Sequence, residues 1–200
     1  MQIQKQLISH ISQDQTNKIL VITGDLTNEG DRSTSRNRLV LLNFLITMSK
    51  YCEILLIAGN HDINMKNLSK DQVDVLEELL MMRGDHQCLK HEITYAKTST
   101  TFLRKGVYFY IHSLLDNNND NLSYKPKQPS VLLYHGAIQS DKLNHYYSNT
   151  ATLPESYINK FDLVLLGDYH SHTFIKPNMA YSGSIISLNH GEAYPHGFIK

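Results

Sequence analysis

The stretch Glu53-Ile-Leu-Leu-Ile-Ala-Gly-Asn-His-Asp62 decides the fold of this chain. Its apolar part, residues 53–58, has the length and unbroken hydrophobicity of a strand that is buried on both faces of a sheet. A glycine and three polar residues follow at once, which is typical of a strand that passes into a turn. We therefore expect a buried strand whose carboxyl end carries the polar cluster Asn60–Asp62.

Three further apolar runs end in the same way: residues 18–23 before Gly24-Asp25, residues 131–134 before His135-Gly136, and residues 161–166 before Gly167–His172. In an open α/β sheet, ligands bind beyond the carboxyl ends of the strands, so these clusters are expected to converge on one pocket. Taken singly, Gly24-Asp25 is more often a turn, and a histidine after a strand is more often a hydrogen-bonded core residue. Four clusters in the same position favour a metal site over coincidence.

Helical periodicity separates these strands. Apolar residues recur at helical spacing over residues 2–13, 35–50 and about 70–83, and a short helix is expected over 155–160. Short strands are expected at 94–96, 102–104 and 106–112, and the chain ends in what reads as a strand at 197–200. Strands that alternate with helices indicate an α/β fold, and without a repeat or linker we expect a single domain over 1–200.

Composition excludes several classes of protein. Of the 200 residues, 41% are hydrophobic, which is enough to bury a core. The 19 basic and 19 acidic residues leave no net charge, whereas nucleic-acid coat proteins and membrane-surface proteins carry a basic excess. The sequence shows no apolar run of about 18 residues, as a membrane span requires, and no signal-peptide core. Cys52 and Cys88 fit reduced thiols, so we expect an intracellular protein, cytoplasmic or nuclear.

The residue types in the four clusters are ligands for divalent metal ions. Aspartate, asparagine and neutral histidine suit ions such as Mn, Fe or Zn. The clusters contain no cysteine, so they do not describe a structural zinc site of the thiolate type. A carboxylate that bridges two ions, with histidine and amide ligands around it, describes a two-metal centre. In such centres, ions about 3.5–4 Å apart stabilise the attacking and leaving oxygens of a phosphoryl displacement.

The ordered set Gly24-Asp25, Gly59–Asp62, His135-Gly136 and Gly167–His170, each after a strand, carries a resemblance to a known family. In these motifs the chain resembles the calcineurin-like metallophosphoesterase superfamily over nearly its whole length. The resemblance implies an α/β sandwich of two mixed β-sheets that pack face to face and are flanked by helices.

A second group of motifs narrows the resemblance. Leu165–His170 is followed by Ala180–Ser184 and Gly191-Glu192, and this order is similar to the nuclease subunit of the bacterial SbcCD complex and its eukaryotic double-strand-break-repair relatives. The narrower resemblance implies DNA as the substrate, cleaved as by an exonuclease or endonuclease. It also implies an SbcC-type ATPase, or a second copy of the chain, as the partner, and no membrane.

The superfamily resemblance assigns the metal ligands. It implies that Asp25 bridges two divalent ions. Asn60, through its amide oxygen, and His135 would bind the second ion. His170 would bind the first ion, and Asp168 would take a coordination position where the family has a histidine. Manganese is the first choice of metal, with iron, zinc or magnesium as the alternatives.

The same resemblance assigns the catalytic residues. His61 would face the phosphate, stabilise developing charge and protonate the leaving oxygen. Asp62 would orient His61 through a ring nitrogen. The nucleophile would be a metal-bound hydroxide, since a bound ion lowers the pKa of water to about 7.

The chain departs from the family at two places. A carboxylate at Asp168, in place of the first histidine of Gly-His-x-His, favours harder ions such as Mn or Mg. A rival alignment, shifted by two residues, uses His170 and His172 as the pair. The family's first strand, with its Asp-x-His motif, is absent before Asp25. This leaves three explanations open: a fragment or misplaced start, a strand donated by another chain, or a degenerate domain with one intact ion site.

Hydrolysis of phosphodiesters, DNA first, is thus the expected function. The alternatives are a small-molecule phosphodiesterase or a protein or nucleotide phosphatase of the same superfamily, and a catalytically impaired scaffold that binds a partner. Among the remaining histidines, His112 is expected to pack inside a strand. The run His145-Tyr146-Tyr147 could stack on bases, although such clusters usually pack.

Overall fold

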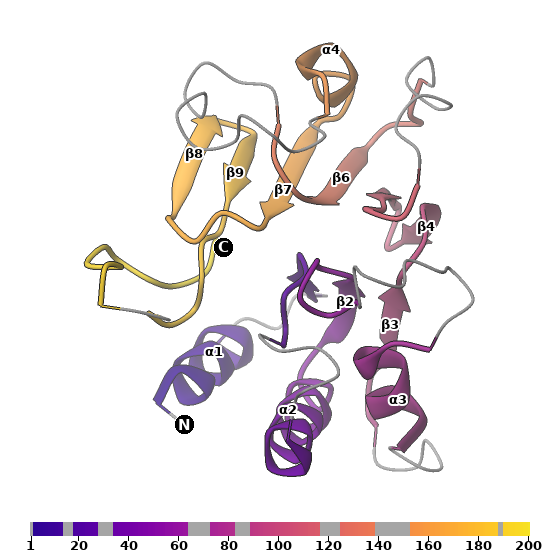
Figure 1. Ribbon diagram of the computed structural model, residues 1–200. Helices are drawn as coiled ribbons and strands as arrows, with labels where there is room; N and C mark the ends of the chain where they lie inside the picture. The colour runs from indigo at the N-terminus through magenta and orange to yellow at the C-terminus, as the bar shows by residue number, and fades with distance from the viewer. Residues whose placement is uncertain are drawn as a thin grey trace. The chain divides into compact units, whose positions relative to one another are not determined.

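The structure is a computed structural model that describes residues 2–13, 18–27, 34–63, 73–82, 89–116, 125–138, 153–187 and 190–200 (Figure 1). The chain divides into two compact units, Met1–Ala96 (unit 1) and Lys97–Lys200 (unit 2). Unit 1 holds a three-stranded sheet and unit 2 a six-stranded sheet. Helices accompany both sheets, so the predicted α/β class with two sheets is confirmed. The single domain over 1–200 stays a prediction.

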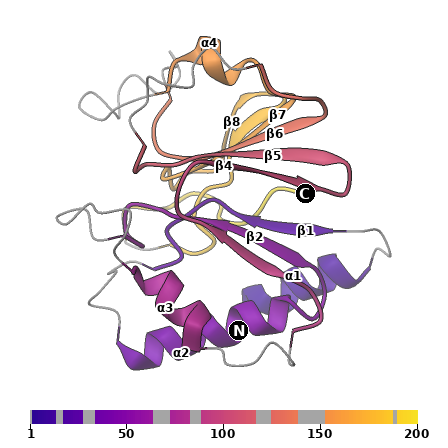
Figure 2. The ribbon, with the colours of Figure 1, turned by 90° about the vertical axis from the view of Figure 1, so that its right-hand side faces the viewer.

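Unit 1 is a parallel sheet with helices on one face. Its strands are in the order β1-β2-β3, and both neighbouring pairs are parallel. Figure 2 shows all three helices below this sheet, on the same side. The elements are α1 (Gln2–Ser12), β1 (Ile19–Ile22), α2 (Ser35–Met48), β2 (Glu53–Ile57), α3 (Val75–Met82) and β3 (Ile93–Ala96).

The core of unit 1 forms where β2 packs against α3. Leu56 of β2 is fully buried and packs with Val75, Leu76 and Leu79. The start of α3 is capped by Asp74, whose Oδ1 accepts hydrogen bonds from the backbone N–H groups of Leu76 and Glu77, both at 2.9 Å. The cap stabilises the start of α3, and the packing holds this helix against β2.

Unit 2 is a mixed sheet in the order β4-β5-β6-β7-β9-β8. The four central strands pair in parallel, and β4 and β8 pair antiparallel at the two edges. Every residue of β6 is buried, as expected for a parallel strand covered on both faces. The elements are β4 (Thr100–Arg104), β5 (Val107–His112), β6 (Ser130–His135), α4 (Glu155–Ile158), β7 (Leu163–Gly167), β8 (Thr173–Lys176) and β9 (Met179–Tyr181).

The core of unit 2 is rich in aromatic side chains. Tyr157 and Phe161 pack edge to face at 5.4 Å between ring centroids. The ring of His112 is buried against Tyr134 and Tyr157, at 5.6 and 5.7 Å between centroids. The prediction that His112 packs inside a strand is therefore confirmed.

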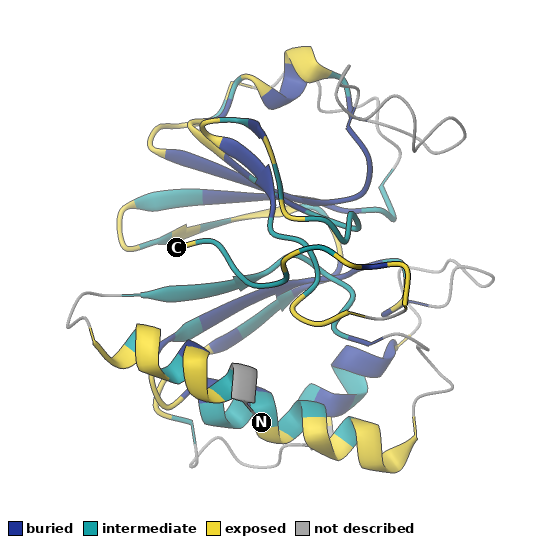
Figure 3. Cartoon of the chain, turned by 90° about the vertical axis from the view of Figure 1, so that its left-hand side faces the viewer, coloured by how far each residue is buried: buried dark blue, intermediate teal, exposed yellow. Residues whose placement is uncertain are grey.

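Two expectations about strands are wrong. The four residues of β1 are half-buried, although their apolar run predicted burial on both faces. Figure 3 shows this strand in the intermediate class beside buried neighbours, and the reason is its place at the edge of the three-stranded sheet. The second error concerns residues 197–200, since the structure has no strand within residues 190–200.

Some predictions lie outside the described residues. They concern Cys88, the run 145–147 and the first residues of the predicted helix 70–83. Within the stretches that the structure describes, no helix is both long enough and apolar enough to cross a membrane.

Candidate metal centre

Two of the polar clusters leave the same edge of the sheet in unit 1. Strands β1 and β2 are parallel neighbours, with Ile22 paired to Leu56 near their carboxyl ends. The loops that follow therefore start side by side, and they contain Asp25 and the Gly59–Asp62 turn. The sequence prediction placed these clusters at strand ends, and the structure confirms that placement for both.

Asp25 fits tightly against the Gly59–Asp62 turn. Its Oδ1 accepts a hydrogen bond of 2.9 Å from the backbone N–H of His61. A Cβ built on Gly59 would lie 2.2 Å from both the backbone nitrogen and Oδ1 of Asp25. No side chain larger than hydrogen fits at that distance, which explains why glycine begins this turn. Asp25 itself has a φ of 52°, in the left-handed region that non-glycine residues rarely adopt.

Asp62 joins the two loops of unit 1. Its Oδ1 accepts hydrogen bonds from the backbone N–H of Thr27 at 2.8 Å and from the hydroxyl of Thr27 at 3.0 Å. Its Oδ2 accepts from the backbone N–H groups of Gly59 at 3.0 Å and Leu26 at 3.3 Å. The family resemblance implies that this carboxylate orients the ring of His61, whereas these four hydrogen bonds go to the backbone and side chain of the two loops.

The environment of Asp62 alters its acidity. The side chain is completely buried, and loss of hydration raises its pKa from 3.8 to about 6. The hydrogen bonds from Thr27 and Gly59 lower the pKa, and the charge of Asp25 raises it, but burial is the largest cause. A carboxyl group with this pKa near a strand end is typical of a functional site as well as of a structural one.

His61 belongs to the same turn and is exposed, although Asp62 beside it is buried. Its backbone carbonyl accepts a hydrogen bond of 3.1 Å from the hydroxyl of Thr27, and the residue as a whole is exposed. Asn60 before it is half-buried. The backbone of His61 is thus held on both sides, through its N–H by Asp25 and through its carbonyl by Thr27.

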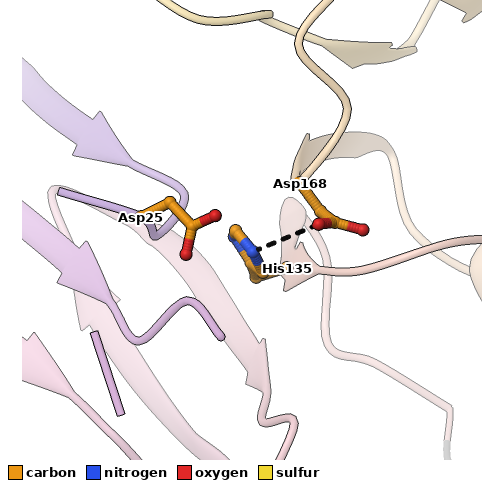
Figure 4. Close-up of side chains that lie close together, drawn as sticks. All are labelled: Asp25, His135 and Asp168. Carbon is orange, nitrogen blue, oxygen red and sulfur yellow. Dashed lines mark ion pairs between the residues drawn. The ribbon is translucent and has the colours of Figure 1, made fainter. Parts of the chain in front are cut away.

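The other two polar clusters leave a shared edge in unit 2. Strands β6 and β7 are parallel neighbours, and their last residues, His135 and Gly167, are paired. The next residue, Asp168, places Oδ1 3.8 Å from Nε2 of His135, an ion pair when the imidazole is protonated (Figure 4). His135 is buried, whereas the Asp168 side chain keeps 27% of its surface exposed. The pair therefore combines a fixed imidazole with a carboxylate that solvent can reach.

The backbone holds this edge in an unusual conformation. Asp168 has a φ of 88°, and Gly136 has a φ of 146°. A Cβ on Gly136 would lie 2.6 Å from the hydroxyl oxygen of Tyr134, so glycine is required there. The hydroxyl of Tyr181 donates a 2.9 Å hydrogen bond to the carbonyl of Gly136. Burial, followed by the charge of Asp168, raises the pKa of Tyr134 to about 12.

The two histidines after β7 have different partners. His170 Nδ1 lies 2.8 Å from Oε1 of Glu192, whose side chain is 6% exposed. His172 is exposed, and its Nδ1 lies 3.1 Å from the backbone carbonyl oxygen of Ser182. Glu192 is the residue of this site that the sequence reasoning did not single out as functional. The signal for it was the pair Gly191-Glu192, which entered only through the narrower resemblance.

The donor groups in each unit suit a divalent metal ion. Asp25 supplies a carboxylate in unit 1, and His135 and Asp168 supply an imidazole and a carboxylate in unit 2. Both carboxylates sit on residues with positive φ, which they share with Lys105 alone among the non-glycine residues that the structure describes. Such backbone strain concentrates at functional sites, because selection keeps it there at a cost of about 1–3 kcal/mol. The residues thus fit the ligand set expected from the sequence.

Comparisons with known proteins agree with this chemistry. The family model for calcineurin-like phosphoesterases matches residues 2–172. An uncharacterized protein of Acanthamoeba polyphaga mimivirus is 28% identical over 197 residues, which cover 91% of this chain. The same alignment covers 14% of the viral protein, so the chain spans a small part of that relative's length.

Proposed function

The chain belongs to the calcineurin-like phosphoesterase family, whose members are metal-dependent phosphoester hydrolases, and on this premise we propose that it cleaves phosphodiester bonds, with DNA as the substrate. The observation that carries the proposal is the His135–Asp168 pair, held 3.8 Å apart at the ends of two parallel strands. A buried imidazole beside a partly exposed carboxylate is a ligand pair for ions such as manganese.

The metal ligands are those that the family resemblance assigns. Asp25, Asn60, His135, Asp168 and His170 would hold two divalent ions, manganese first. When bound, such ions neutralise phosphate charge and lower the pKa of coordinated water to about 7. The positive φ values of Asp25 and Asp168 support their assignment, because strained backbone concentrates at functional sites.

The chain's own groups would then act on the substrate. His61 is exposed and its backbone is held by Asp25 and Thr27, and its imidazole would donate a proton to the leaving oxygen. Asp62 would keep the two loops of unit 1 together through its four hydrogen bonds. Replacing His61 should therefore lower turnover strongly without removing a metal ligand.

DNA is proposed because of the segment that follows β7. The Ser182–Ser184 turn after β9 packs on the backbone of residues 170–172, since a Cβ on Gly183 would lie 2.7 Å from the carbonyl oxygen of His170. The Tyr-Ser-Gly-Ser motif thus contacts the histidine loop, and the order of these two motifs is the feature that resembles SbcCD-type nucleases. We extend the proposal to an SbcC-type ATPase, or a second copy of this chain, as the partner.

A small phosphodiester is the second candidate substrate. The chain carries no net charge, and long DNA is bound mainly through positive charge on the protein. On this alternative the same residues would hydrolyse a small phosphodiester or a phosphate monoester, as a phosphatase does.

Three substrates separate these possibilities. The protein is freed of metal with a chelator, supplied with Mn²⁺ and assayed on linear DNA, bis-p-nitrophenyl phosphate and p-nitrophenyl phosphate. Cleavage of DNA and of the diester supports the proposal, and activity confined to the monoester contradicts it. Cleavage of the diester without DNA favours the second candidate, and no turnover on any substrate favours a scaffold.

Two histidine variants check the assignment of His61. His61→Ala should lower turnover by about 10²–10⁴-fold, the usual contribution of a general acid, and leave Mn²⁺ affinity largely unchanged. His91→Ala is the matched control, because His91 is also an exposed histidine of unit 1. Loss of metal binding in His61→Ala would show that its role is misassigned.

A further inference from the structure

Glu192 is a buried carboxylate with a specific contact. Its side chain is 6% exposed, and its Oε1 lies 2.8 Å from Nδ1 of His170. Burial of a carboxylate is costly unless hydrogen bonds compensate for the lost water, so this contact is a strong one. The side chain of His170, by contrast, is 39% exposed. The imidazole therefore has one nitrogen held from the protein side and a surface open to solvent.

The backbone around His170 is fixed by a different segment. The N–H of Ser184 donates a 2.9 Å hydrogen bond to the carbonyl of His170. Gly183, with a φ of 76°, approaches the same loop so closely that a Cβ would lie 2.8 Å from the backbone nitrogen of His172. The main chain of the loop is thus contacted by residues 183–184, whereas the carboxylate of Glu192 contacts the imidazole of His170.

His196 connects the backbone of Glu192 to the segment at residues 183–184. Nε2 of His196 lies 3.3 Å from the backbone oxygen of Glu192, and Nδ1 of His196 lies 2.9 Å from Oγ of Ser184. One imidazole therefore bridges the backbone of Glu192 and the turn that holds the His170 loop. The carboxylate reaches His170 from a segment whose position relative to that loop is fixed.

We propose that Glu192 is a positioning residue that keeps His170 in the tautomer protonated at Nδ1, which leaves the lone pair of Nε2 for a divalent metal ion. The inference rests on the proposed function, which makes His170 a metal ligand. An ionised carboxylate accepts hydrogen bonds and has none to donate, so the ring nitrogen that faces Glu192 carries the hydrogen. The opposite nitrogen, Nε2, then has a lone pair that can bind a metal ion. Such a carboxylate partner also fixes the orientation of the ring, so that the free nitrogen faces the metal position.

The contact also distinguishes the two alignments of the histidine motif. His170 faces a buried carboxylate, whereas His172 faces a neutral backbone carbonyl at 3.1 Å and is exposed. The charged partner of His170 favours the alignment in which His170, and not His172, pairs with Asp168 as a metal ligand. We expect substitution of His170 to remove metal binding and substitution of His172 to leave it nearly unchanged.

The test measures the tautomer of His170 and the affinity for a metal ion in two separate experiments. Nitrogen-15 NMR of the metal-free protein reports the tautomer of His170, and calorimetry with Zn²⁺, which is diamagnetic, reports affinity. The wild type should show the Nδ1–H form of His170. Glu192→Ala should shift His170 toward the Nε2–H form and lower Zn²⁺ affinity by about 10–100-fold, the usual effect of losing such a partner.

Two further variants complete the test. In Glu192→Gln the amide oxygen can still accept the Nδ1 hydrogen bond, so the tautomer should be retained and affinity should fall less than in Glu192→Ala. Glu155→Gln is the matched control, because Glu155 is an exposed carboxylate of unit 2 that pairs with Lys176. This control should match the wild type in both measurements.

The outcomes separate the inference from the function on which it rests. A wild type with His170 in the Nε2–H form, or unchanged Zn²⁺ affinity in Glu192→Ala, would overturn the positioning role while leaving the proposed function standing. Absence of Zn²⁺ binding by the wild type would instead refute the proposed function and, with it, the role of His170 as a ligand. Rescue by glutamine but not by alanine would support both.

Discussion

Gly59→Ala tests how unit 1 holds its polar loops. A Cβ at this position would lie 2.2 Å from the backbone nitrogen of Asp25, 2.2 Å from its Oδ1 and 2.9 Å from its Cγ. Real Cβ atoms do not approach heavy atoms so closely, and the obstacle includes a backbone atom that cannot rotate away. The loop that contains Asp25 must therefore move to admit the methyl group.

The cost of that movement follows from the contacts it disturbs. Adding a carbon to a packed site costs about 1–3 kcal/mol of stability. The shift also strains the 2.9 Å hydrogen bond from His61 to Asp25, whose loss adds about 1 kcal/mol. We therefore expect Gly59→Ala to lower the free energy of unfolding by about 2–4 kcal/mol, and Mn²⁺ affinity to fall because Asp25 is displaced.

Two other glycines provide the controls, and urea unfolding of the metal-free proteins provides the measurement. Gly106 has a φ of 80° but nothing within 4 Å of a Cβ, so Gly106→Ala measures backbone strain alone, about 1–2 kcal/mol. Gly197 also has open space and no left-handed φ, so Gly197→Ala should change stability by less than about 1 kcal/mol. If Gly59→Ala unfolds at the same urea concentration as Gly197→Ala and binds Mn²⁺ like the wild type, the reasoning is refuted.

Two further predictions concern carboxylates of the site. Because Asp168 has a φ of 88°, Asp168→Gly should be more stable than Asp168→Ala by about 1–2 kcal/mol in urea unfolding of the metal-free protein. Both variants should lose Mn²⁺ affinity. Equal stability of the two variants would contradict backbone strain at this position. Burial raises the pKa of Asp62 to about 6 from 3.8, so its contribution to stability is present below pH 4 and is lost as pH rises through 6. The unfolding free energy of the metal-free wild type, relative to Asp62→Asn, should thus fall by up to about 3 kcal/mol between pH 4 and 7, and a rise would show that the hydrogen bonds to Asp62 outweigh burial.

Local sequence predicted the elements because the hydrophobic pattern reflects burial directly. The run at 53–58 became β2, whose Leu56 is fully buried. The equally apolar run at 18–23 became β1, which is half-buried because it lies at the sheet edge. Strand order is a property of pairing between distant segments, so an apolar run alone cannot distinguish an edge strand from a central one.

The same limit applies to the site. Strand-end placement correctly put Asp25 in the loop after β1 and His135 at the carboxyl end of β6. It did not reveal the loop contacts of Asp62, which depend on the backbone N–H groups of Leu26 and Thr27. Glu192 lies 22 residues beyond His170 and follows no strand directly, so no local pattern connects the two side chains.

The most direct test of the central claim is a calorimetric Mn²⁺ titration of the metal-free wild type, Asp25→Ala, His135→Ala and the double variant. The claim is that Asp25 and His135 are ligands of divalent metal ions. It predicts two Mn²⁺ ions per wild-type chain and a Mn²⁺ affinity that falls in each single variant and falls furthest in the double variant. Unchanged affinity in either single variant, or a wild type that binds no Mn²⁺, would contradict it.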